Sequence, residues 1–516
     1  MARVLAQDVV WLLLAAQWAA AETATFAVVN ARAWTGDPNR SWAEAVAVDG
    51  ERILAVGSGA EIRALCGAST RIVDAKGAML TPGFIDSHIH LMAYDRSHPL
   101  PPLFLRFVRG REEAAAQIAA YVAKLPKGSW ILGEDWTDST WGGQLPSRQW
   151  LDSIAPDHPV WLVEVEGNAG LANSAALRAA GITRDTPDEP PGLIARDTRG
   201  EATGLIRGGP MWRIEAAIVE RSREEDDRLL ERVMTGLLRA GVTSVHHNNS
   251  WYDFLVLRRL HEAGRLRLRV YASPQLPAWQ RMRDYTAAHG RGDAWMHWGG
   301  LKGYGAINGG DYYRWVTGAS RAGLQVMVHL GSEAELRTLL DVFARVRSEQ
   351  SLRDPRFRVE HAHDMPLDLI PMLLNAGAIV SWQPPLLAHA DQRTAAGSVP
   401  PKSLFNCRAL LGAGVRIAFG TDTYPGREIV TPLASLQMAL ERAAPDGSRL
   451  TLDEALRAFT LDAAYAEFAE KQKGSLEAGK LADFVLFDRD FSRAGAHSIG
   501  DAKVRMTVVG GRVMFE

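Results

Sequence analysis

The chain has 516 residues, more than one hydrophobic core supports, so we expect one large domain and a smaller one. Hydrophobic residues make up 47% and charged residues 23%, as in folded globular proteins, which excludes a disordered chain. The net charge is -2 without long runs of like charge, which argues against nucleic acid or an anionic membrane as a partner. We expect a small-molecule partner, and a homo-oligomer is compatible with this composition. The only cysteines, Cys66 and Cys407, allow one disulfide at most.

Residues 1–21 have the layout of a secretory signal peptide. Arg3 precedes the apolar run 9–16, and Ala19–Ala21 provide a cleavage site. Asp8 departs from this layout, which leaves an amphipathic N-terminal helix as the alternative. The run is shorter than the roughly 18 to 20 apolar residues of a membrane span. We therefore predict export to the periplasm or the outside, or a cytoplasmic location if the leader is not a signal.

Both ends of the chain are rich in short apolar runs separated by turn residues, which predicts β-strands. Asp49-Gly50 is a strong hairpin signal. Because chain termini often lie close together, residues 22–80 and 472–516 are predicted to form one small sheet domain.

Between the two ends, apolar runs alternate with helical patterns, which is typical of a parallel sheet. Eight strands are predicted, at 78–85, 241–245, 268–272, 300–304, 324–329, 357–361, 378–382 and 415–419. Eight units favour an α/β fold with a closed (β/α)₈ TIM barrel over residues 81–471. Residues 95–240 are too long for one crossover and are predicted to form an insertion, or lid, after the first barrel strand. Thr451–Glu454 form a capping box that predicts the start of a helix running towards Glu470.

His88 and His90 stand two residues apart at the end of the first predicted barrel strand. Residues i and i+2 of a strand point the same way, so both imidazoles can face one metal ion. Taken alone, the pair is equally compatible with rings that only hydrogen-bond to their neighbours.

Four further residues lie at or near the C-terminal ends of other predicted strands, where barrel enzymes carry their catalytic residues. These are Lys302, His329, His361 and Asp422. Each alone has a structural explanation, such as a core histidine, a surface lysine or a turn aspartate. Six such residues on one rim instead favour a metal site.

At these residues the chain resembles the metal-dependent amidohydrolase superfamily, within it amidohydrolase family 3, the branch that includes N-substituted formamide deformylase. The most specific motifs are at 82–90, 358–362, 420–422 and 474–483, and those at 133–136 and 173–177 also resemble this branch.

The resemblance implies a small β-sandwich domain from both chain ends and a barrel with one or two divalent metals, usually zinc. It implies His88, His90 and Asp422 as ligands of the more buried metal, and His329 and His361 as ligands of the other. Lys302 matches the lysine that takes up carbon dioxide as a bridging carbamate. We expect a metal-activated water to hydrolyse a C–N amide bond of a small N-acyl, N-formyl or cyclic amide, with Asp422 as general base and acid.

Other activities stay open: a superfamily deaminase, which would not need Lys302, an esterase or lactonase, or a non-catalytic binding barrel. The chain has Asn168 where the family usually carries a histidine, and the loop after Lys302, with Tyr304, departs from the family pattern. Asn168, Tyr304 and Trp136 are predicted substrate contacts. The extra histidines His246, His247 and His363 are predicted to support the site or the fold rather than to bind metal.

Overall fold

The computed structural model describes residues 23–92, 103–105, 108, 110–136, 141, 147–164, 169–188, 192–208, 210–218, 223–248, 250–303, 309–330, 333–362, 365–387, 406–424, 430–444, 446–493 and 495–516. The predicted leader, residues 1–21, lies outside them. Within these ranges, no helix combines the length and the apolar character needed to cross a bilayer.

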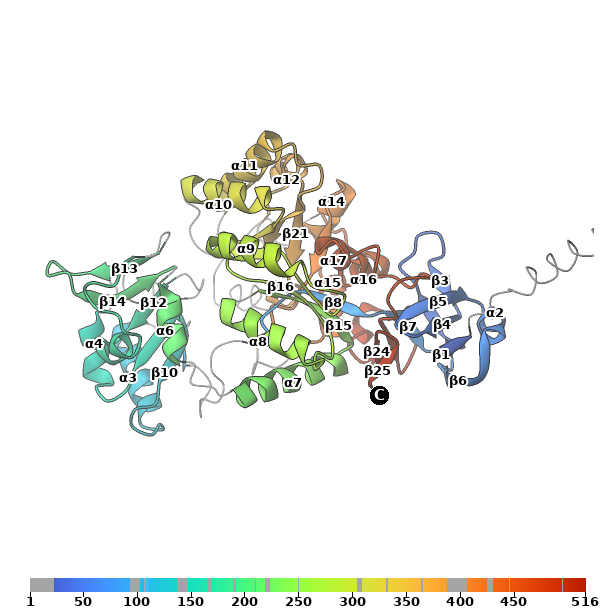
Figure 1. The fold of residues 1–516 in the computed structure, drawn as a ribbon, viewed down its shortest axis with the longest axis horizontal. Coiled ribbons are helices and arrows are strands. Elements are labelled where there is room, and N and C mark those ends of the chain that lie inside the picture. Colours follow the sequence, from blue (N-terminus) through green and yellow to red (C-terminus); the bar gives the residue numbers. More distant parts are fainter. Residues whose placement is uncertain are drawn as a thin grey trace, which may run out of the picture.

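A ring of parallel strands forms the centre of the molecule (Figure 1). One sheet has the order β17-β16-β15-β8 and the next the order β18-β19-β20-β21-β22. Their bounds are β8 Phe84–Ile89, β15 Val242–Asn248, β16 Arg269–Ser273, β17 Met296–Trp298, β18 Gly300–Gly303, β19 Gln325–His329, β20 Phe357–Glu360, β21 Ala378–Trp382 and β22 Ile417–Phe419.

Contacts between edge strands join the two sheets. β22 packs beside β8, and β16 packs beside β18. Just beyond the strand ends, the Asp422 N–H donates to the His88 carbonyl (2.8 Å), and the Lys302 N–H donates to the Pro274 carbonyl (2.8 Å). Seven of the eight predicted barrel strands occur in the predicted order, as a TIM barrel requires. The first, predicted at 78–85, is displaced: Met79–Pro82 form strand β7 of another sheet, and β8 is the barrel strand.

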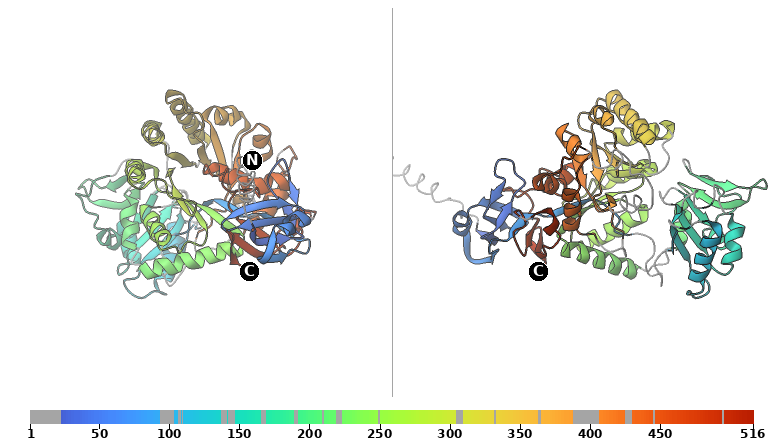
Figure 2. Two further views of the ribbon diagram at one scale, coloured as in Figure 1. Left: turned by 45° about the vertical axis from the view of Figure 1, so that its right-hand side comes forward. Right: turned by 180° about the vertical axis from the view of Figure 1, so that it is seen from behind.

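Helices cover the ring, and a large apolar cluster fills the space between helices and strands (Figure 2). The helices are α7 Arg223–Arg239, α8 Trp251–Glu262, α9 Trp279–His289, α10 Gly309–Arg321, α11 Glu333–Glu349, α12 Ile370–Ala376, α14 Cys407–Gly412 and α15 Pro432–Glu441. In α11, Leu336, Leu339, Leu340, Phe343 and Val346 recur every three to four residues and are all buried. This spacing gives the helix one apolar face towards the strands.

The capping box at Thr451 and Glu454 begins helix α16 (Leu452–Ala458), as predicted. The predicted continuation towards Glu470 is wrong, because α16 ends and a second helix, α17 (Leu461–Ala466), follows. Thr460 separates them, with non-helical backbone angles and a hydroxyl that donates to the Leu456 carbonyl (2.7 Å). Such side-chain bonds to a carbonyl four residues back bend helices.

The end segments form two sheets, and in one of them strands from both chain ends lie side by side. The six-stranded sheet has the order β25-β24-β23-β7-β2-β3 and the four-stranded sheet the order β5-β4-β1-β6. Their bounds are β1 Ala24–Val29, β2 Arg32–Trp34, β3 Trp42–Ala43, β4 Ala45–Asp49, β5 Arg52–Gly57, β6 Cys66–Asp74, β7 Met79–Pro82, β23 Phe484–Phe487, β24 Val504–Val509 and β25 Arg512–Phe515. Asp49 and Gly50 turn the chain between β4 and β5, as their hairpin signal predicts. The rings of Phe26 and Phe484 stack across the two ends at 6.0 Å.

The long segment after β8 builds a sheet of its own, in the order β13-β14-β12-β11-β10-β9. Its elements are β9 Leu103–Phe104, α3 Arg111–Val122, β10 Ile131–Trp136, α4 Arg148–Ile154, β11 Val160–Glu164, β12 Ala169–Ala172, α5 Ser174–Ala179, β13 Leu193–Arg196, β14 Ala202–Arg207 and α6 Met211–Ile218. In Figure 1 this unit lies at the opposite end of the molecule from the blue strands β1–β6. α7, also within the predicted insertion range, packs against β15 and β24 instead, so this separate unit ends before residue 223.

Cys66 and Cys407 are both free thiols, so the disulfide left open by the sequence does not form.

Candidate metal centre

Three of the predicted ligands form a compact cluster where β8 meets the segment after β22. Oδ1 of Asp422 lies 3.5 Å from Nε2 of His88 and 3.4 Å from Nε2 of His90. The three ligand atoms lie within 4.8 Å of one another, and both imidazoles are buried. Two ligand atoms that are each about 2.0–2.1 Å from a tetrahedral zinc ion lie roughly 3.4 Å apart. The spacing of these side chains therefore fits a divalent metal.

The other three predicted residues lie against this cluster. Nζ of Lys302, which is fully buried, is 3.1 Å from Nε2 of His88. The ring of His361 lies 4.7 Å from that of His88, and the ring of His329 lies 4.4 Å from that of His361. All six residues predicted from the sequence thus converge on one end of the barrel.

Backbone geometry holds the ligands in place. Asp86 binds two strands together, because its carboxylate accepts the N–H of His88 (3.1 Å), the N–H of Thr421 (3.0 Å) and the hydroxyl of Thr421 (2.6 Å). A Cβ atom on Gly420 would lie 2.6 Å from the His88 nitrogen, so only glycine permits this approach. His361 and Asp422 have φ angles of 73° and 52°, a left-handed conformation that costs free energy and is concentrated at functional sites.

Glu360 sets the tautomer of His88. Its Oε2 lies 2.5 Å from Nδ1 of His88, and its Oε1 lies 2.8 Å from Nε of Arg358. Burial opposes ionisation of Glu360, but Arg358, His88 and Lys302 together outweigh it and hold the pKa of this carboxyl below its usual range. An ionised Glu360 accepts the Nδ1 proton, so the lone pair of His88 Nε2 is free for a metal. Burial also lowers the pKa of His88 to about 4, which keeps the imidazole neutral.

Asp422 supplies the charge that a metal cation needs. Burial raises the pKa of its carboxyl, but His90 and His88 lower it more, so the net shift is downward. Among the described residues, only the two imidazoles lie close to its buried Oδ1. Two neutral imidazoles and one carboxylate form a donor set that zinc and related divalent metals accept. The residues present therefore fit the metal that the sequence predicts.

A chain of buried polar groups continues from Glu360 into the barrel. Nη1 of Arg358 donates to Nδ1 of His246 (2.8 Å), and Nε2 of His246 lies 3.3 Å from Oε1 of Glu467. Nζ of Lys473 lies 2.8 Å from the same oxygen. His246 therefore supports buried charges, at a distance from the metal ligands.

His247 also has a structural partner. Its Nδ1 accepts the N–H of Leu91 (3.0 Å), directly after the His90 ligand.

None of the predicted substrate contacts lies at the metal cluster among the described residues. Trp136 is fully buried in the apolar core of the inserted unit, and its indole N–H donates to the Leu162 carbonyl (2.8 Å). This corrects the prediction that it lines a substrate pocket, since none of its surface is left for a ligand. Asn168, Tyr304 and His363 lie outside the described residues.

Two contacts at the site were not predicted. One is the Glu360–His88 pair, although Glu360 lies inside a quoted motif. The other is Tyr424, whose ring stacks on that of His90 at 4.3 Å. Its position two residues after Asp422 could have indicated that Tyr424 lies at the site.

Comparison with known proteins agrees with this geometry. A model of the amidohydrolase family matches residues 71–515. The chain is 30% identical to Protein LONG AFTER FAR-RED 3 of Arabidopsis thaliana, over 95% of this chain and 91% of that protein. It is 27% identical to N-substituted formamide deformylase of Arthrobacter pascens, over 95% of this chain and 98% of that protein.

Solved structures support the fold. An uncharacterised metal-dependent hydrolase of Pyrococcus furiosus aligns with a TM-score of 0.64 and 23% identity, over 91% of this chain and all of that one (100%). Atrazine chlorohydrolase TrzN of Arthrobacter aurescens, solved with zinc, aligns with a TM-score of 0.55 and 16% identity, over 95% of this chain and 94% of that one. The barrel, its metal-binding cluster and the match over most of its length together show that this chain belongs to the amidohydrolase family, as a metal-dependent hydrolase of carbon–nitrogen bonds.

Proposed function

We propose that this protein hydrolyses the C–N amide bond of a small N-acyl, N-formyl or cyclic amide, with a divalent metal, zinc in the first instance, as cofactor. One observation carries the proposal. The carboxylate of Asp422 lies between the imidazoles of His88 and His90 at ligand-to-ligand spacing, on the barrel end where catalytic residues occur.

When bound, the metal supplies an acidified water and polarises the amide oxygen. The protein's own residues position and move the proton. Asp422, held ionised in the cluster, is the general base that accepts a proton from the attacking water and then returns it to the leaving nitrogen. Glu360 accepts the Nδ1–H of His88, which directs the Nε2 lone pair of His88 to the metal and leaves Asp422 as the base.

Lys302 is proposed to react with carbon dioxide. Its amine adds to the carbon of CO₂ and releases one proton, giving a carbamate anion. The reaction needs the neutral amine, and burial lowers the pKa of Lys302 to about 8. A larger share of the amine is therefore neutral near pH 7 than for an exposed lysine. The exchange of a cation for an anion beside His88, His329 and His361 would allow this side chain to hold one or two metals.

We further propose that residues 22–80 and 472–516 form a small β-sandwich domain and that the inserted unit acts as a lid or specificity element. Residues 1–21 are proposed as a signal peptide for export. The partner is taken to be a small-molecule amide, with no role for nucleic acid or a membrane span.

The test starts with metal analysis of the purified protein. The protein is then assayed on N-formyl compounds, N-acyl amino acids, lactams, esters and lactones, with detection of the released amine, alcohol or hydroxy acid. Metal bound in at least a one-to-one ratio, with amine release that a chelator abolishes, is the expected result. Protein that is metal-free and inert on the whole panel, or active only on esters and lactones, would contradict the proposal.

A further inference from the structure

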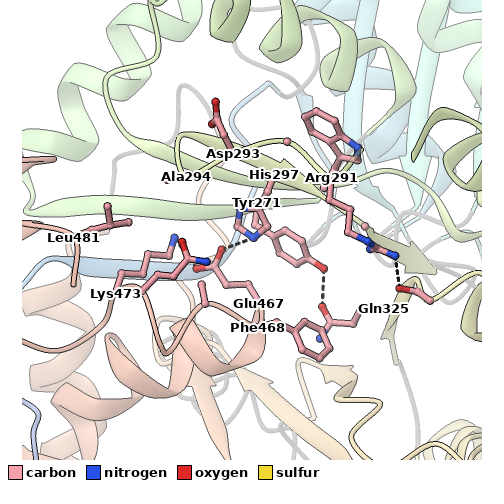
Figure 3. A pocket seen from close by; sticks show the side chains of 16 residues that line it. Tyr271, Arg291, Asp293, Ala294, His297, Gln325, Glu467, Phe468, Lys473 and Leu481 are labelled. Atoms are coloured by element: carbon pink, nitrogen blue, oxygen red, sulfur yellow. Dashed lines mark hydrogen bonds and ion pairs between the residues drawn. The ribbon is translucent and has the colours of Figure 1, made fainter. Parts of the chain in front are cut away.

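We propose that a cavity at the N-terminal ends of the barrel strands binds a small organic carboxylate with an apolar body, at a site separate from the metal centre. This floor cavity has a volume of about 600 Å³. Its lining includes Tyr271, Arg291, His297, Glu467, Phe468 and Lys473 (Figure 3). Gln325, which also lines it, begins β19, whereas the predicted ligand His329 ends that strand. The cavity and the metal cluster therefore lie at opposite ends of the barrel.

The two carboxylates of the cavity already have partners. Glu467 is buried, with Oε1 2.8 Å from Nζ of Lys473 and Oε2 3.1 Å from Nε2 of His297. Asp293 lies 3.0 Å from Nε2 of His261 and accepts two backbone N–H groups. Lys473 thus balances the charge of Glu467, and the exposed Asp293 directs its carboxylate to His261 and two backbone N–H groups.

Arg291 is different. Within the described ranges its guanidinium has no carboxylate partner, and Nη2 donates to the carbonyl of Gly323 (2.8 Å). Two glycines make room for it. A Cβ atom on Gly299 would lie 2.4 Å from Nη1, and one on Gly323 would lie 3.2 Å from Nη2. Although Arg291 is exposed, its guanidinium thus lies against the backbone at the cavity wall, where it can pair with the carboxylate of a ligand.

Aromatic surface lies across the cavity from Arg291. Phe468 exposes 47% of its surface. Its backbone has a φ of 63°, a left-handed conformation that is uncommon for bulky residues. The guanidinium of Arg356, 4.4 Å from the ring centre, helps to fix this ring. Figure 3 places Tyr271 between Arg291 and the Glu467–Lys473 pair.

This arrangement defines the class of ligand. A guanidinium binds a carboxylate with two parallel hydrogen bonds, and exposed aromatic rings bind an apolar or aromatic body. A neutral compound of the same shape would lack the charge that Arg291 recognises. Benzoate is therefore the probe, and benzamide is its matched neutral control.

Calorimetric titration of the purified protein with each compound tests the proposal. We expect benzoate to bind, benzamide to bind at least about tenfold more weakly, and Arg291→Gln to weaken benzoate at least about tenfold. Arg291→Lys, which keeps the charge but not the paired hydrogen bonds, should fall between. Arg283→Gln, which changes an exposed arginine on α9, should leave the affinity unchanged.

Benzoate binding in the cavity must be distinguished from benzoate binding to the metal, because carboxylates also bind zinc. Benzoate binding should persist in protein stripped of metal with a chelator. The proposal is overturned if Arg291→Gln binds benzoate as wild type does, if wild type binds neither compound, or if metal removal abolishes the binding. These titrations involve no turnover, so their outcome is independent of the proposed hydrolysis.

Discussion

Oε2 of Glu360 lies 2.5 Å from Nδ1 of His88, and both side chains are buried beside the metal ligands. The pair converts a histidine that could carry its proton on either nitrogen into one that presents Nε2 to the metal. Glu360 is thus a positioning residue, since it acts on the metal through His88.

Glu360→Gln should weaken metal binding about 10–100-fold, because an amide no longer fixes the tautomer of His88. Zinc affinity, measured by competition with a chromogenic chelator, checks this. The variant also leaves Arg358 without its carboxylate, so affinity must be measured on protein with native circular dichroism. Glu262→Gln, at an exposed carboxylate, is the control. Unchanged zinc affinity in folded Glu360→Gln would contradict the role of Glu360.

Asp422→Asn should reduce kcat about 10²–10⁴-fold, because an amide cannot accept the proton of the attacking water. Asp422 is also a predicted ligand, so kcat must be compared at equal metal content, with excess zinc supplied where needed. A variant that holds its metal and keeps full activity would contradict the role of Asp422 as general base.

Lys302 should carry a carbamate. Protein reconstituted with zinc and ¹³C-bicarbonate should give a carbamate carbon signal in its NMR spectrum, and Lys302→Arg should not. Arginine keeps the positive charge and does not form the carbamate, so zinc content should fall as well. Lys471→Arg, at an exposed lysine, controls for labelling elsewhere. A wild-type protein with full zinc content and no carbamate signal would rule out this modification.

The barrel and its six rim residues could be predicted because both depend on local patterns. Most barrel strands contain a short apolar run, although β18 and β20 also bury charged residues, and parallel strands place their C-terminal ends on one side. His329 ends β19, and Asp422 follows β22 by three residues, so the rim could be predicted by locating strand ends.

The interior could not be predicted in this way. Arg358, His246 and Glu467 come from segments far apart in the chain. His246 was predicted to support the site or the fold, but nothing in the sequence identifies its partners. Their mutual contacts depend on strand register across the barrel, which local composition does not encode. Trp136 was misassigned for a similar reason, since a tryptophan in a strand suits both a core and a pocket.

Trp136→Ala should destabilise the inserted unit by about 3–5 kcal/mol, because it leaves a cavity in the core of that unit. Limited proteolysis should then cleave within residues 103–207 faster than in wild type, and hydrogen exchange of β10 and β11 should increase. A variant with unchanged proteolysis and hydrogen exchange but a raised KM would instead support the original prediction that Trp136 contacts the substrate.

The buried Glu467 should make stability depend on pH. Burial alone would raise its pKa, but Lys473 and His246 outweigh burial and hold it well below the ordinary value of 4.5. A carboxyl with a depressed folded-state pKa stabilises the protein above the unfolded-state value and loses that contribution as the pH falls towards the folded-state value. The free energy of unfolding should therefore decrease as the pH drops below about 4.5.

Glu467→Gln should remove this part of the acid dependence. At pH 7 it should destabilise the protein by about 3–5 kcal/mol, because Lys473 stays buried without its counter-charge. Urea unfolding of both proteins between pH 3.5 and 7, followed by circular dichroism, measures the difference. The gap between wild type and variant should narrow below about pH 4.5, because Glu467 of the unfolded wild type then binds a proton that the folded protein does not. A gap that stays constant would show that folding leaves the pKa of Glu467 unchanged, and a gap that widens towards low pH would show that folding raises it; either contradicts this prediction.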